Sequence, residues 1–135
     1  MQRFVGLLAA TAATAAATGC GAQAKPLPLA HWFSSTSAQR SVTITLIPGY
    51  TGAYAGFNFN GYGKGQVEVV VPVGWRVRIR CRNTGAVRHS CAIVPSPGFS
   101  SPSIHGSSTP HPQAGLQPGR AASFSFVAGA PGCTG

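Results

Sequence analysis

Residues 57–94, FNFNGYGKGQVEVVVPVGWRVRIRCRNTGAVRHSCAIV, are the stretch that decides the fold of this chain. Short runs of β-branched and aromatic residues alternate here with Gly and Pro, which is the pattern of strands joined by turns. Beyond residue 19, no stretch of ten or more residues places apolar side chains at helical spacing. The sequence therefore predicts an all-β domain.

Several segments have the composition of strands. Residues 41–47 (SVTITLI), 66–71 and 75–83 are the clearest, and residues 89–94 (HSCAIV) follow a turn. Residues 57–60 alternate rings and amides. We expect Phe57 and Phe59 in the core and Asn58 and Asn60 on the other face, where their amides can tie down a turn. Trp75 is expected to pack in the core.

The strand at residues 75–83 has two different faces. Val77, Ile79 and Cys81 form an apolar face, and the opposite face carries four arginines: Arg76, Arg78, Arg80 and Arg82. One interpretation is a docking stripe for an acidic partner or for phosphate headgroups, since guanidinium groups make bidentate contacts. The other, which we favour, is a solvated face that prevents aggregation.

The charge balance narrows the classes of function. Ten Lys and Arg stand against one acid, Glu68, which gives a net charge of +9. Acidic partners, anionic lipids or nucleic acid would be attracted to such a protein. Nucleic acid is disfavoured because the chain has no recognition helix. A single carboxylate also excludes an enzyme that needs a carboxylate pair.

The N-terminal segment indicates export. Residues 1–19 have one cation followed by an apolar, small-residue run, as in a signal peptide. The run ends in Ala-Thr-Gly-Cys, which resembles a bacterial lipobox, so we expect a lipid on Cys20 and a membrane-anchored protein in the periplasm or at the cell surface. The alternative is an ordinary cleaved signal peptide in which Cys20 has no role.

Residues 20–40 are expected to be a tether, and residues 41–135 the domain. The tether assignment follows from a low charge and a content of Pro and Ser. Within it, His31 and Trp32 are expected to be exposed or loosely packed.

Three histidines follow the tether. His89 stands at the entry to a predicted strand, where the backbone would hold its imidazole rigidly at a loop-lined end of the domain, and it is our candidate metal ligand. His105 and His111 belong to a loop rich in Ser, Pro and Gly, and we expect them in solvent. Cys81 and Cys91 either form a disulfide or are two small buried residues, and the sequence leaves both open.

The runs FNFNG, VVVPVGWRVRIRCRN and RHSCAIV resemble sulfocyanin, a member of the cupredoxin (blue copper) family. The resemblance implies a Greek-key β-sandwich that carries single electrons through one copper ion, bound by two His, one Cys and a weak Met. By this likeness His89 matches the first copper histidine, and Asn83 matches the asparagine of the strand before it.

The C-terminal residues depart from that family. In sulfocyanins a further strand, the ligand Cys, a Pro-Gly-His segment and the Met follow, whereas this chain ends in Ala130-Pro-Gly-Cys133-Thr-Gly135. We therefore expect the last strand of the sandwich to be missing. Three interpretations are open: a fragment or frameshifted product, a site completed by Cys133 with His105 or His111, or a metal-free domain.

The resemblance implies an exported electron-transfer protein and not an enzyme, with a respiratory redox protein of acidic docking surface as its partner. The alternative is a metal-free β-sandwich lipoprotein that acts as a binding module through its arginine face.

Overall fold

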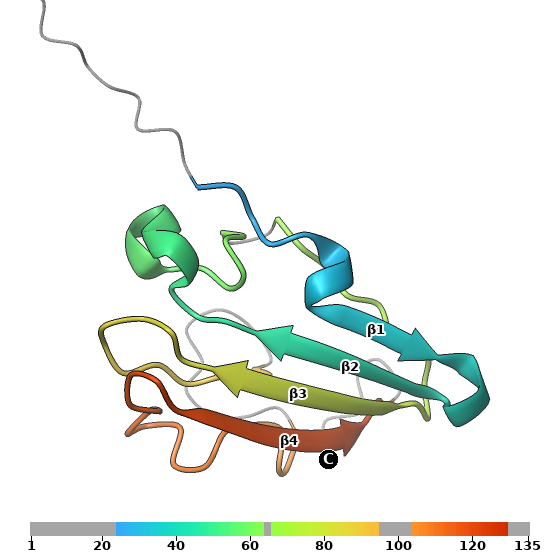
Figure 1. Ribbon diagram of the computed structural model, residues 1–135. Coiled ribbons are helices and arrows are strands. Elements are labelled where there is room, and N and C mark those ends of the chain that lie inside the picture. The colour runs from blue at the N-terminus through green and yellow to red at the C-terminus, as the bar shows by residue number, and fades with distance from the viewer. Residues whose placement is uncertain (1–23, 64–65, 95–103, 130–135) are drawn as a thin grey trace, which may run out of the picture.

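Four strands form one mixed sheet in the order β1-β2-β3-β4 (Figure 1). The computed structural model describes residues 24–63, 66–94 and 104–129. The strands are β1 (Phe33–Thr36), β2 (Ser41–Leu46), β3 (Arg76–Arg82) and β4 (Ala121–Val127), and the 3₁₀ helices are η1 (Leu29–His31), η2 (Ser37–Gln39) and η3 (Tyr50–Gly56). The prediction of an all-β fold is confirmed.

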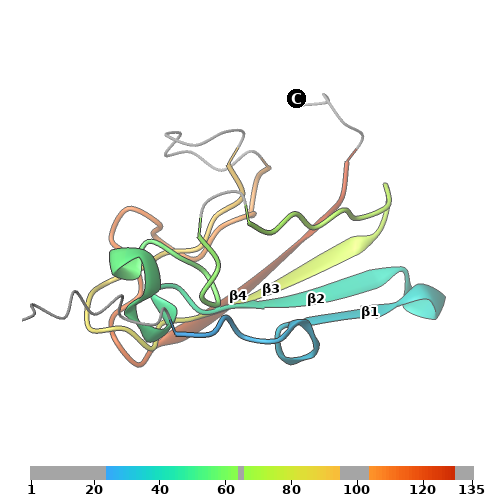
Figure 2. The same cartoon turned by 90° about the horizontal axis from the view of Figure 1, so that it is seen from above.

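The central pair of strands is parallel and the outer pairs are antiparallel. Ser41 to Leu46 of β2 run beside Arg76 to Cys81 of β3, while β1 and β4 pair antiparallel with β2 and β3. A parallel pair needs a long crossover connection. Here residues 47–75 make it, and the long connections gather on one side of the sheet (Figure 2).

The sheet has an apolar face and a basic face, as the sequence of β3 predicts. Along β3 buried and exposed residues alternate without interruption. Trp32 and the buried residues Val42, Ile44, Val77 and Ile79 form the core on the side covered by the connections, and Trp75 packs against this cluster. We call this side of the sheet the inner face and the opposite side the outer face.

Residues 27–36 were predicted to belong to a tether, but in the structure they pack on the domain. Trp32 is only 5% exposed. Its Nε1 donates to the Leu27 carbonyl at 3.1 Å, and its ring meets Tyr62 edge to face. The next residues, Phe33–Thr36, form β1. The segment therefore belongs to the domain because it covers one end of the core.

Two predicted strands are not regular strands in the structure. Residues 66–71 belong to none of the named strands. The segment that begins at His89 pairs only through isolated bridges, between His89 and Leu116 and between Ala92 and Ser108. Residues 66–70 are exposed, whereas residues 89–94 are buried or half-buried, so β-propensity in these runs did not ensure a place in a sheet.

Residues 57–60 are oriented opposite to the prediction. Phe57 is 85% exposed, whereas Asn58 and Asn60 are 6% and 2% exposed. The amides are buried because they are fully used: Asn58 Nδ2 donates to the Ala53 carbonyl at 2.6 Å, and Asn58 Oδ1 accepts from Gly61 N. Hydrogen bonds to backbone make burial of an amide tolerable.

Asn60 joins this loop to the end of β2. Its Oδ1 accepts from Ile47 N at 2.8 Å and its Nδ2 donates to the Thr45 carbonyl at 2.9 Å. Only Asn58 therefore bonds to the turn that begins at Gly61, as predicted, and the predicted face was wrong for both amides.

Substituting Phe57 by Ser is expected to change the free energy of unfolding by less than about 0.5 kcal/mol, because the ring is already in solvent. Chemical denaturation would measure it. Ile79→Ala, at a position 1% exposed, is the buried control and is expected to destabilise clearly. A Phe57→Ser variant as unstable as the control would show that the ring packs in the core.

In the described part of the chain, no helix is both long enough and apolar enough to span a bilayer.

Candidate metal centre

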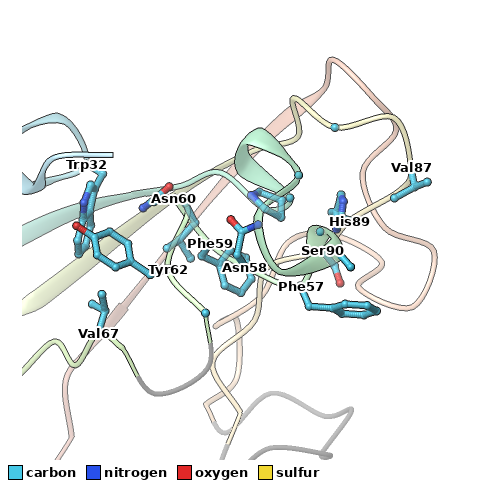
Figure 3. Close-up of a pocket in the computed structure, with 18 of the residues that line it drawn as sticks. Trp32, Phe57, Asn58, Phe59, Asn60, Tyr62, Val67, Val87, His89 and Ser90 are labelled. Atoms are coloured by element: carbon cyan, nitrogen blue, oxygen red, sulfur yellow. The ribbon is translucent and has the colours of Figure 1, made fainter. Parts of the chain in front are cut away.

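His89 lies in the wall of an apolar cavity of about 1030 Å³. The floor includes the inner-face residues Ile44, Leu46 and Ile79, and the loops contribute Phe57 and Phe59, among others. Figure 3 shows His89 near the end of the cavity where Phe57 and Val87 lie. The cavity and the sheet's apolar face are thus continuous.

The backbone of His89 is held on both sides by one residue of another loop. His89 N donates to the Leu116 carbonyl at 3.2 Å, and the His89 carbonyl accepts from Leu116 N at 2.6 Å. A reciprocal pair of this kind fixes the residue as a strand pairing would. The prediction that the backbone holds this histidine in place is therefore supported by a bridge instead of a strand.

Two glycines make room for the imidazole. A Cβ atom on Gly49 would lie 3.0 Å from His89 Nε2, and one on Gly85 would lie 3.4 Å from the same atom. Gly49 also has a positive φ of 65°, which disfavours any other residue. The ring is therefore packed between two backbone turns.

Gly49→Ala is expected to cost about 1–2 kcal/mol of stability and to displace the His89 ring, because both the backbone and the new methyl group are strained. The His89 ring resonances in an NMR spectrum would report the displacement. Gly52→Ala is the matched control, since Gly52 also has a positive φ, of 69°, but open space around its Cβ. If both variants leave the His89 resonances unchanged, the ring does not pack against Gly49.

Asn83 holds the turn that carries His89. Its side chain is fully buried, Nδ2 donates to the Val87 and Leu116 carbonyls at 2.8 and 2.9 Å, and Oδ1 accepts from Gly85 N at 2.9 Å. One amide thus joins the start of the turn, its end and the loop that pairs with His89. The sequence indicated Asn83 only through the family resemblance.

A disulfide joins Cys81, at the end of β3, to Cys91, two residues after His89. Both cysteines are 0% exposed. The bond therefore connects the His89 segment directly to the sheet. It also means that neither sulfur is available as a thiolate ligand.

The other candidate metal, lipid and thiol residues are exposed or fall outside the described residues. His105 and His111 are exposed. Cys20 and Cys133 fall in residues 1–23 and 130–135, which the structure does not describe. Among residues 24–63, 66–94 and 104–129, no group of three or more His, Cys, Asp or Glu is placed to hold a metal ion.

The described residues fit a copper ion only in part. His89 supplies a fixed imidazole next to an apolar cavity, which suits a ligand of a copper–thiolate centre. A copper site of that class needs a thiolate and a second imidazole as well, and the described residues hold no group of three or more His, Cys, Asp or Glu that could supply the full set. The described part of the site is one ligand and its support.

The fold is an all-β domain built on one mixed sheet, with His89 at the loop end of its apolar face. A family model described as the sulfocyanin (SoxE) domain matches residues 28–105, more than half of the chain. The chain belongs to the sulfocyanin family, whose members are cupredoxin-like electron carriers. No curated protein and no solved structure matches the chain.

Proposed function

We propose that this protein is an exported carrier of single electrons that binds one copper ion with His89 as a ligand. The observation that carries the proposal is the fixed imidazole of His89 beside the apolar cavity of a sulfocyanin-family domain. Bound copper would supply a centre that gains and loses one electron. We propose that the protein carries electrons and does not act as an enzyme.

The chain's own residues would hold the ligand still and keep water away. The Leu116 bridge fixes the His89 backbone, the Gly49 and Gly85 turns confine its ring, and the cavity side chains are mostly apolar. A centre that rearranges little exchanges electrons readily, since little energy is spent on moving its ligands. A rigid sheet and loop end serve this purpose.

Cys133 is the thiol we propose as the second ligand. The sequence has four cysteines, and two of them are joined as the Cys81–Cys91 disulfide. Of the other two, Cys20 is proposed to carry a lipid, which leaves Cys133. This assignment rests on elimination among the cysteines of the sequence.

Native mass spectrometry of the full chain with added Cu(II) tests the proposal. We expect one copper ion per chain, and a loss of binding of at least about tenfold in His89→Ala, because imidazole is a main ligand of such a site. His31→Ala is the matched control, since His31 is exposed in η1. Equal copper binding by His89→Ala and the wild type would refute the role of His89.

We further propose that a lipid on Cys20 anchors the protein to a membrane facing the periplasm or cell surface. The support is the leader of residues 1–19 and the Ala-Thr-Gly-Cys sequence at its end. A Cys20→Ser variant should leave the membrane fraction. Its retention there would contradict lipid anchoring through this residue.

The redox partner is proposed to be a respiratory protein with an acidic docking surface. The net charge of +9 would steer such a partner toward this protein. The rate of electron exchange should therefore fall as ionic strength rises. A rate that is insensitive to salt would contradict electrostatic steering.

A further inference from the structure

The outer face of the sheet carries a row of arginines along one strand. Arg76, Arg78, Arg80 and Arg82 are all exposed on β3, a central strand. Alternate residues of a strand lie about 6.6–6.8 Å apart on the same face. The row is therefore evenly spaced and one arginine wide.

Hydroxyl side chains flank the row on both sides. Residues paired across a sheet share a face. On that basis Arg78 lies between Thr43 of β2 and Ser125 of β4, and Arg80 lies between Thr45 and Ser123. Each arginine of the middle of the row thus has a hydroxyl donor on either side, at the strand spacing of about 4.8 Å.

Two more arginines lie at the ends of the row. The Arg40 carbonyl accepts from Arg76 N at 2.9 Å, and the Arg120 carbonyl accepts from Asn83 N, next to Arg82, at 2.9 Å. The only acid of the sequence, Glu68, lines a hollow with Phe33, an inner-face residue. Within the part of the chain that the structure describes, no carboxylate therefore lies on this face to neutralise the row.

The row is separate from the metal-ligand candidate. His89 lines a cavity whose floor is made of Ile44, Leu46 and Ile79, which point away from the arginines. A molecule lying on the row would have the sheet between itself and His89. The row is thus poorly placed to dock an electron-transfer partner. Its ligand is therefore expected to differ from the redox partner.

We propose that the outer face binds a linear phosphodiester polymer of the polyol-phosphate class, with its phosphate groups along β3. Arginine forks and flanking hydroxyls are donors that suit phosphate oxygens. A single line of cations matches a chain of anions, whereas a lipid surface would be matched by cations spread over two dimensions.

The described part of this face lacks aromatic side chains, which disfavours other polyanionic partners. Residues 33–36, 41–46, 76–82 and 121–127 contribute no aromatic side chain to it. Single-stranded nucleic acid is usually held by stacking on aromatic rings. The centres of stable protein interfaces are enriched in Trp, Tyr and Arg packed together, and this face has the arginines without aromatic partners. The polymer is therefore expected to carry neither bases nor apolar groups.

Binding of synthetic poly(glycerol phosphate) to the full chain, measured by isothermal titration calorimetry, tests the proposal. Arg78→Ser/Arg80→Ser should weaken binding more than about tenfold at low salt, because two charge-assisted contacts are lost. Lys25→Ser/Arg88→Ser removes the same charge from exposed positions outside the row and should weaken it less than about threefold. The Arg78→Lys/Arg80→Lys variant keeps the charge, but its affinity for the polymer should still fall by about threefold or more.

Four outcomes would overturn the proposal. Equal losses in the two Ser variants would show a delocalised effect of net charge. Monomeric glycerol phosphate binding as tightly as the polymer would show that no row is needed. Phosphatidylglycerol vesicles or polyglutamate binding more tightly through the same arginines would assign the face to a membrane or an acidic protein. Unchanged side-chain NMR signals of the β3 arginines in the wild-type complex would place the polymer elsewhere. Copper binding by His89 is unaffected by any of these results.

Discussion

Asn83→Ala is expected to lower the free energy of unfolding by about 3–5 kcal/mol, because it leaves buried backbone groups without partners. The Val87 and Leu116 carbonyls would lose a donor and Gly85 N would lose its acceptor. The turn that presents His89 should loosen as well. Chemical denaturation gives the free energy, and hydrogen exchange of residues 84–89 gives the local effect.

Asn83→Asp separates the two roles of this amide. It keeps an acceptor for Gly85 N but removes both Nδ2 donors, so we expect it also to be strongly destabilising. Thr84→Ala, at an exposed position of the same turn, is the matched control and should change stability by less than about 0.5 kcal/mol. An Asn83→Ala variant no less stable than Thr84→Ala would contradict the role of this hydrogen-bond network.

Removal of the Cys81–Cys91 disulfide is expected to cost about 2–4 kcal/mol, since the bond restricts the unfolded chain. The sequence separation of 10 residues puts the entropic part near the lower end of this range. Cys81→Ala/Cys91→Ala, compared with the wild type by thermal and chemical unfolding, measures it. Protection of His89 N from exchange should fall in the same variant, because the bond holds its segment to β3.

Reduction of the wild-type chain by dithiothreitol is an independent form of the same experiment, which leaves the buried atoms in place. Cys20 and Cys133 are present in both the oxidised and the reduced chain, so their contributions to the difference in stability cancel. Equal stability of the oxidised and reduced chains would show that the disulfide does not secure the His89 segment.

The regular strands were predictable because their side chains alternate. The sequences SVTITLI and WRVRIRCRN have two distinct faces, and both form central strands, β2 and β3. By contrast β1 has only four residues, with three exposed positions in succession, so no alternation marked it. Residues 66–71 have strand propensity, yet no described segment pairs with them. The pattern of side chains along a segment indicates a strand, but it does not indicate which other segment pairs with that strand.

The orientation of residues 57–60 could not be read from hydrophobicity alone. Asn58 and Asn60 are buried in place of the two rings because backbone groups of distant residues, such as Thr45 and Ile47, satisfy their amides. Those partners are known only once the chain is folded. The same holds for Asn83, whose partner Leu116 is 33 residues away.

At the candidate metal centre, the position of His89 could be anticipated but its surroundings could not. A histidine entering an extended segment suggested a fixed imidazole. The confinement of its ring by Gly49 and Gly85 depends on two turns that the sequence marks only by glycine. The Cys81–Cys91 pair was open between a disulfide and two buried thiols, and the structure has the disulfide.

The two faces of the sheet suggest a division of tasks. The inner face, closed by loops, supports His89 and the cavity, while the outer face carries cations and hydroxyls in solvent. Substitutions of side chains on one face should therefore leave the other face intact, since the two sets of side chains share no contacts across the sheet backbone.

The most direct test of the account is the visible absorption spectrum of the full chain, in a Cys20→Ser background, after addition of Cu(II). We predict an intense blue band from a thiolate bound to copper, which disappears in Cys133→Ser and in His89→Ala. A folded protein that shows no such band, or a band that survives both substitutions, would contradict the proposal that this chain carries electrons through copper held by His89.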